Sequence, residues 1–170
     1  SGGGLYNDGQ LILYNTSLLH NQSKLDGGGL CNSPTGTADI DRCTVAYNLA
    51  SGGPVFSGGG GLYNGGTMHV NRTKICNNST DKNGGGIYNP TTLRNSLVAN
   101  NSNGGQYTVA GGIRVTEACQ GIINSTIVNN KGQGIAAAYI NNWGNLVNLA
   151  DTFSIHNSIC FGNEIQLAGN

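Results

Sequence analysis

The chain has 170 residues, of which 29 are glycine and 25 are asparagine, with eight basic and eight acidic residues and a formal net charge of zero. This length suffices for one domain with its own core. The sequence has no cluster of basic residues, so it predicts neither a nucleic-acid nor an anionic-membrane partner. No apolar run approaches the roughly 20 residues that are needed to cross a bilayer.

A block of three glycines, an aliphatic residue, an aromatic residue or cysteine, and an asparagine occurs four times. The blocks occupy residues 2–7, 27–32, 59–64 and 84–89. Weaker versions begin at Gly111 and Gly134. Glycine permits unusual backbone angles and close approach of neighbouring turns, and the aliphatic residue that follows is a predicted core position.

A second motif of nine residues follows most of these blocks. Its copies span residues 13–21, 40–48, 70–78, 93–101, 122–130 and 155–163 and close on Asn21, Asn48, Asn78, Asn101, Asn130 and Asn163. The closing asparagines are 23 to 33 residues apart, a spacing typical of solenoids.

Positions within the nine-residue motif keep their character. The first position is aliphatic in all six copies. Position six is aliphatic in five copies and is Cys160 in the last copy, and position four always carries a small side chain. Because strand side chains alternate, we expect positions four and six to face inward and position five to face solvent. The two positions after the first form a predicted bend. Asparagine suits it because it tolerates left-handed backbone, as at Asn15, Asn95, Asn124 and Asn157.

These combined motifs resemble the right-handed parallel β-helix repeats of bacterial surface and secreted proteins, including those of chlamydial polymorphic outer membrane proteins. The resemblance implies an all-β, right-handed parallel β-helix (β-solenoid) of about six coils, formed by residues 1–170 as a single domain. It also implies an extracellular or cell-surface location and often an adhesive role, without catalytic residues to transfer. The last two coils depart from the pattern, since the Tyr-Asn pair is missing there.

Stacked coils would place like residues over like, about 4.8 Å apart. We therefore expect the six closing asparagines to form a ladder of amides bonded to one another. The N-x-[ST] triplets are interpreted as bend and ladder residues rather than as glycan acceptors.

Two surfaces are predicted to contact a ligand or partner. The segment 136–153 carries Tyr139 and Trp143, which could stack on a sugar, although this apolar loop could instead cap the core. The seventh motif position forms the other surface, an apolar stripe that either contacts a partner or lies under a loop of the same chain. Its members are Leu19, Ala46, Cys76, Ala99, Val128 and Phe161.

The remaining reactive residues predict no catalytic, cofactor or metal site. Asp39 and Asp41 are the only close acids with the same facing, and we interpret Asp41 as a surface charge partner of Arg42 and Arg72 across coils. The three histidines occupy different motif positions, so they assemble neither a zinc site nor a triad. The five cysteines should be mostly free and buried, with a bridge at Cys31 or Cys119 left open.

The first coil should present open backbone edges, because Ser1 stands within a glycine block with no polar cap before it. The chain is then either a piece of a longer solenoid or a subunit that joins end to end with other copies. Together these features predict a non-enzymatic structural or adhesive cell-surface protein, which could assemble end to end into an extracellular filament. Its expected partners are further copies of itself, neighbouring solenoid segments or surface glycans. The alternative is a secreted carbohydrate-binding or carbohydrate-cleaving β-helix with a loop-borne site near Trp143.

Overall fold

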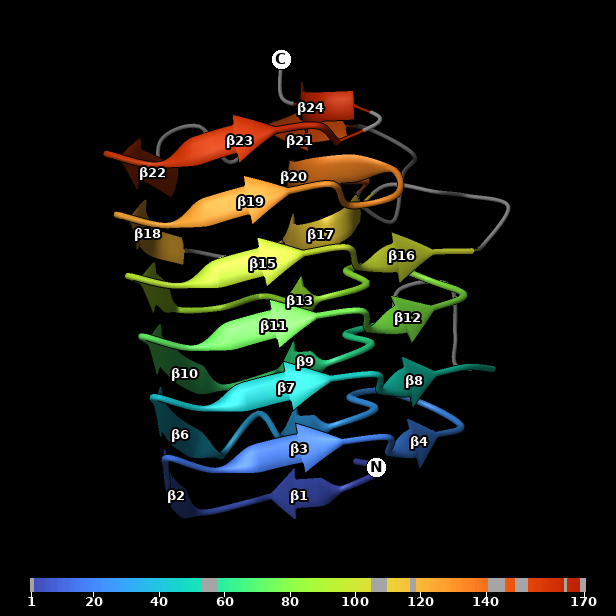
Figure 1. Cartoon of the computed structure of the whole chain (residues 1–170). Helices are drawn as coiled ribbons and strands as arrows, with labels where there is room; N and C mark the ends of the chain where they lie inside the picture. Colours follow the sequence, from blue (N-terminus) through green and yellow to red (C-terminus); the bar gives the residue numbers. More distant parts are fainter. Residues whose placement is uncertain are drawn as a thin grey trace.

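The computed structural model shown in Figure 1 describes residues 2–52, 58–104, 110–116, 119–140, 146–148, 153–163 and 165–168. All regular structure in these residues is β-strand, and none of them lies in a helix. The chain climbs in coils, with the front strands running left to right and the rear strands returning. This path is right-handed, and the predicted right-handed parallel β-solenoid is confirmed.

Four sheets, named here by their positions in Figure 1, run along the solenoid. The rear sheet contains β1 (Leu5–Asn7), β5 (Leu30–Asn32), β9 (Leu62–Asn64), β13 (Ile87–Tyr88), β17 (Ala110–Val115), β20 (Gln133–Ile140), β21 (Leu146–Asn148) and β24 (Ile165–Ala168). The left sheet contains β2 (Gln10–Tyr14), β6 (Thr37–Asp41), β10 (Thr67–Asn71), β14 (Thr92–Arg94), β18 (Cys119–Ile123) and β22 (Phe153–His156).

The other two sheets close each coil. The front sheet contains β3 (Ser17–Leu19), β7 (Thr44–Ala46), β11 (Lys74–Cys76), β15 (Leu97–Ala99), β19 (Thr126–Val128) and β23 (Ile159–Phe161). The right sheet contains β4 (Gln22–Ser23), β8 (Leu49–Ala50), β12 (Ser79–Thr80) and β16 (Ser102–Asn103). Pairing between coils is parallel, and the antiparallel pair β20–β21 is the exception among the described strands.

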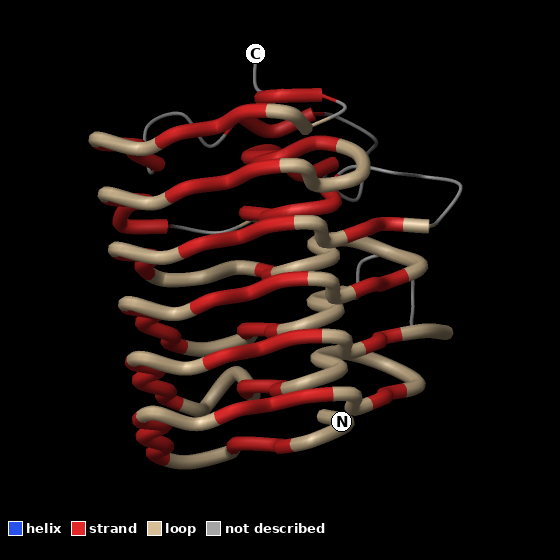
Figure 2. The backbone as a smooth tube through the Cα atoms, in the orientation of Figure 1, coloured by secondary structure: helices blue, strands red, loops and turns tan. Residues whose placement is uncertain are grey.

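The number of complete coils differs from the predicted six. The left and front sheets each have six strands, but the right sheet has four, so four coils carry all four strands. The chain is too short for a right-hand strand after β19, because β20 begins at Gln133, only five residues after Val128. Figure 2 shows this difference between the lower four coils and the upper part of the solenoid.

Residues at the same motif position stack in register, as predicted. Val45, Ile75 and Val98 pair in successive coils of the front sheet, and Ile40, Val70 and Leu93 do so in the left sheet. These aliphatic side chains belong to one core that runs along the inside of the coils. We call each set of residues stacked in this way a file. Burial of apolar surface along these files is the main favourable contribution to folding.

The predicted bend between the left and front sheets is confirmed. Asn15, Asn95, Asn124 and Asn157 have left-handed backbone with φ between 47° and 50°. Arg42 and Arg72 take the same conformation at this bend in the second and third coils. A second left-handed position, which the sequence analysis missed, precedes all six closing asparagines. It is occupied by His20, Tyr47, Asn77, Asn100, Asn129 and Gly162.

The glycine blocks serve two physical purposes. Their first glycine has left-handed backbone at Gly27, Gly59 and Gly84, with φ of 60°, 69° and 63°. Their second glycine leaves no room for a side chain. A Cβ on Gly85 would lie 2.4 Å from the carbonyl oxygens of both Gly111 and Ser102. The blocks therefore permit both the turn and the close stacking of coils.

Candidate functional site

The closing asparagines form the predicted ladder. Each Nδ2 from Asn21 to Asn130 donates to the Oδ1 of the closing asparagine in the next coil, at 2.9–3.0 Å. The same Oδ1 accepts the backbone N–H of the lower asparagine, at 2.8–3.0 Å. From the second coil upward, Nδ2 also donates to a carbonyl oxygen of the coil below, as in the 2.9 Å bond from Asn78 to Val45. The ladder fixes the vertical register of the coils.

A second, shorter ladder begins in the glycine blocks, and the sequence analysis missed it. Nδ2 of Asn7 donates to Oδ1 of Asn32 at 2.7 Å, and Nδ2 of Asn32 donates to Oδ1 of Asn64 at 2.8 Å. The series ends at Asn89, whose backbone carbonyl accepts from Asn64 and whose Nδ2 donates to Thr116. The sequence signal that could have predicted this ladder is the asparagine at the end of each glycine block, which recurs in the first four coils.

The first coil presents an open edge, which we call the N-terminal edge. Strands β1, β2, β3 and β4 are terminal in their four sheets. The core is less covered there, since Leu13 is 9% exposed whereas Ile40, stacked on it, is 1% exposed. Oδ1 of Asn21 accepts no hydrogen bond from the described residues, although every higher ladder oxygen accepts two from the coil below. The edge is therefore able to accept a further coil.

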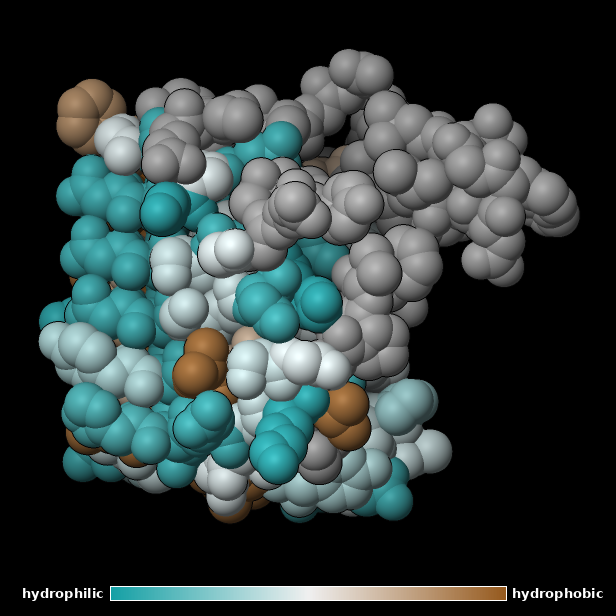
Figure 3. Space-filling model, turned by 90° about the vertical axis from the view of Figure 1, so that its right-hand side faces the viewer, coloured by the Kyte–Doolittle hydropathy of each residue, from teal (hydrophilic) through white to brown (hydrophobic). Residues whose placement is uncertain are grey.

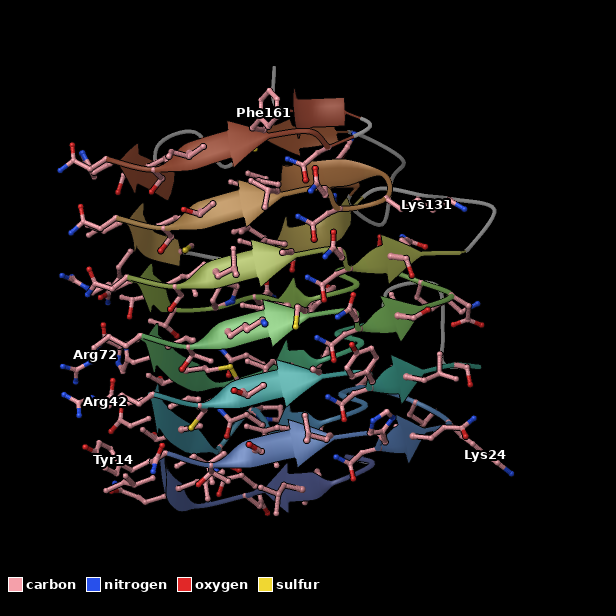
Figure 4. The ribbon with its side chains drawn as sticks, in the orientation of Figure 1. Tyr14, Lys24, Arg42, Arg72, Lys131 and Phe161 are labelled. Carbon is pink, nitrogen blue, oxygen red and sulfur yellow. The ribbon has the colours of Figure 1, made fainter. Side chains whose placement is uncertain are left out.

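The apolar stripe predicted at motif position seven exists as one file in the front sheet. Leu19 and Phe161 stand at its ends and are 44% and 71% exposed. The middle members, Ala46, Cys76 and Ala99, are buried, and Val128 is partly buried against them. The structure therefore brings the predicted residues into one line but leaves the exposed apolar surface at its two ends. Phe161 lies at the top of the solenoid in Figure 4, with its ring pointing upward.

The structure describes neither aromatic side chain of the predicted sugar-stacking loop. Trp143 lies outside the described residues, and for Tyr139 the structure describes only the backbone, within β20. The sugar-stacking prediction therefore stays a prediction. Over the right sheet, the described surface is mostly hydrophilic, with apolar residues standing singly (Figure 3).

The charged residues near the left bend form the cross-coil pair that the sequence predicted, with one difference. Arg72 binds both carboxylate oxygens of Asp41, at 2.9 and 2.6 Å. Arg42 donates instead to the phenol of Tyr14, at 3.1 Å. The Arg72 hydrogen bond lowers the pKa of Asp41. Figure 4 shows Tyr14, Arg42 and Arg72 above one another on this exposed corner, where an ion pair contributes little to stability.

Cys31, Cys43, Cys76 and Cys119 are free thiols and are buried. Burial raises the pKa of the Cys119 thiol to about 11 and that of Cys160 in the same direction. The thiols of Cys119 and Cys160 are thus protonated at neutral pH. The four buried cysteines pack as small apolar side chains. Within the described part of the chain, no three His, Cys, Asp or Glu residues gather as metal ligands would.

Comparison with known proteins gives no match, either to protein-family models, to curated proteins or to solved structures. Among the described residues, no helix has the length and apolarity needed to span a membrane.

Proposed function

We propose that this chain is a structural or adhesive β-solenoid of the cell surface, and that it stacks end to end with further β-solenoid coils. The observation that carries the proposal is the N-terminal edge. Four parallel edge strands lie there, and Oδ1 of Asn21 accepts no hydrogen bond from the described residues. Strand edges of this kind pair readily with another chain, and a head-to-tail contact of this type need not close, so it extends into a filament.

The docking coil would either come from a second copy or from a neighbouring solenoid segment. The side that it would cover includes Leu11, which packs partly buried against the open end of the core. The extracellular location is supported by the likeness of the repeats to those of bacterial surface proteins. A non-enzymatic role is supported by the sequence, in which Asp39 and Asp41 are the only close acids with the same facing, because acid–base cleavage of a polysaccharide uses clustered carboxylates.

Sedimentation velocity and negative-stain electron microscopy of the purified chain test the proposal. We expect oligomers that lengthen with concentration. Leu11→Lys places a charge at the open end of the core and should abolish them, because inward-pointing charges block edge pairing. The matched control is Ile12→Lys, since Ile12 is 78% exposed and faces the other side of the strand.

Circular dichroism must first show that both variants retain the β-sheet spectrum and a cooperative melt. A third variant, Asn21→Leu, removes the unfilled acceptor without a charge and should weaken assembly. Wild-type chains that remain monomeric at high concentration would remove the case for self-assembly. Oligomers that persist unchanged in Leu11→Lys would show that a surface other than the N-terminal edge joins the copies.

A further inference from the structure

Arg114 is the one buried arginine among the described residues and lies in β17 of the rear sheet. It follows Tyr63 and Tyr88 in a file on the outer side of this sheet, at the position that tyrosine occupies in the coils below. The neighbouring Ile113 belongs to the core, so the side chain of Arg114 points the other way. Its exposed fraction is only 8%.

The guanidinium of Arg114 has no bonding partner in the described structure. Its Nε is buried without a hydrogen bond. The ion pairs between described residues are Arg72–Asp41 and Lys82–Asp81, and neither involves Arg114. Burial lowers the pKa of this arginine, while Tyr88 acts in the opposite direction. An arginine nevertheless stays charged in proteins, so its positive charge is buried and is not compensated by any described residue.

Polar groups near Arg114 are held in fixed positions. Oγ1 of Thr116 lies 3.3 Å from the phenol oxygen of Tyr88. Asn89 anchors Thr116, since its Oδ1 accepts the backbone N–H at 2.5 Å and its Nδ2 donates to Oγ1 at 2.8 Å. The ring of Tyr88 stacks on that of Tyr63, with centroids 5.0 Å apart and planes 18° apart. Arg114 pairs in register with Tyr88 and stands two residues before Thr116, so the cation and the two hydroxyl groups come from adjoining positions, as a preorganised site requires.

We propose that Arg114 is the anchor of an oxyanion-binding site on the outer side of the rear sheet, with a carboxylate as the preferred group. A planar guanidinium matches a carboxylate with two parallel hydrogen bonds, and such charge-assisted bonds are stronger than neutral ones. The neighbouring Thr116 and Tyr88 hydroxyls can orient the bound group. Sulfate and phosphate share the negative oxygens but lack the planar shape, so they should bind more weakly.

The Nε–Hε signal of Arg114 in ¹⁵N-labelled protein reports directly on the proposed site. We would titrate the full chain separately with sodium glucuronate, sodium acetate, sodium sulfate and sodium phosphate, using sodium chloride at equal ionic strength and neutral glucose as controls. We expect a saturable shift of this signal with glucuronate and acetate. At ten times the dissociation constant, bound ligand should also raise the melting temperature by about 3–6 °C.

Arg114→Gln should lose the melting-temperature response, and Arg114→Lys should retain a weaker one, because lysine offers a point charge without the planar fork. Arg94→Gln is the matched control, since Arg94 is an exposed arginine on a neighbouring coil and its loss should leave the response intact. Assembly in Arg114→Gln should equal that of the wild type, which separates this site from the N-terminal edge.

Two results would overturn the proposal. If chloride gives the same shift as the carboxylates at equal ionic strength, the response is general screening and no oxyanion site exists. If no anion shifts the signal and Arg114→Gln lowers the melting temperature, the guanidinium pairs with a carboxylate of the chain itself and has a structural role. Saturable binding of sulfate or phosphate without carboxylate binding would uphold the site but refute the carboxylate preference.

Discussion

Replacing Asn78 with leucine tests whether the asparagine ladder holds the coils together. The side chain of Asn78 is fully buried and makes four hydrogen bonds. Its Oδ1 accepts the backbone N–H and the Nδ2 of Asn48, at 3.0 and 2.9 Å. Its Nδ2 donates to the carbonyl of Val45 and to Oδ1 of Asn101, at 2.9 and 3.0 Å. Leucine can replace none of these bonds.

The expected loss follows from these contacts. The buried N–H of Asn48 is left without its acceptor, at a cost of about 1–3 kcal/mol, and each of the three other lost bonds contributes about 0.5–1.5 kcal/mol. We therefore expect the free energy of unfolding to fall by at least about 2.5 kcal/mol. For a chain of this size, that loss lowers the melting temperature by about 5 °C or more.

Thermal unfolding followed by circular dichroism and calorimetry measures the effect against two further leucine variants. Asn21→Leu removes a single side-chain bond at the N-terminal edge, of 3.0 Å to Asn48, so it should cost only about 1 kcal/mol. Lys74→Leu changes an exposed side chain on β11 and should alter stability by less than about 0.5 kcal/mol. Asn78→Ala, which adds no volume, should also destabilise.

The ordering of these variants decides the argument. If Asn78→Leu melts within about 2 °C of the wild type, or if Asn21→Leu is equally damaging, the ladder does not carry the stability assigned to it. Destabilisation by Asn78→Leu without any by Asn78→Ala would identify overpacking, rather than lost hydrogen bonds, as the cause.

Three other predictions concern coil spacing, a buried thiol and a surface ion pair. Gly85→Ala should sharply lower the melting temperature, because its Cβ would lie 2.4 Å from two backbone oxygens. Gly9→Ala is the control and should leave the melting temperature unchanged, since a Cβ there meets no atom within 4 Å. Equal melting temperatures for the two variants would contradict the role assigned to the glycine blocks. Burial raises the pKa of Cys119 to about 11 from 9.0, so the folded chain keeps a proton that the unfolded chain loses, and stability should fall as pH rises from about 9 to 11. Chemical denaturation at several pH values should show a smaller fall for Cys119→Ala, and an identical pH dependence would refute the assignment. Arg72→Gln should return the pKa of Asp41, followed by NMR, toward its ordinary value while the melting temperature changes by no more than about 1 °C; a large drop in melting temperature would show that the pair is structural.

The sequence by itself determined the solenoid and the residues that face inward. Side-chain direction alternates along a strand and like residues stack in successive coils, so the motif positions of Val45, Ile75 and Val98 were enough to identify a core file. The left-handed bend at Asn95 was also readable, because the conformation is local and asparagine tolerates it. These features depend only on the repeated motif, which occurs six times in the sequence.

The tertiary structure decided which groups meet outside the repeat. Arg42 binds Tyr14 rather than Asp41, and the number of complete coils is four because the chain after β19 is too short for another right-hand strand. Arg114 stands where lower coils carry tyrosine, and only the stacked coils show that its Nε is buried without a hydrogen bond to the described residues. Hydrogen-bond partners between coils and the burial of an outer side chain depend on three-dimensional contacts between distant residues, which motif spacing does not encode.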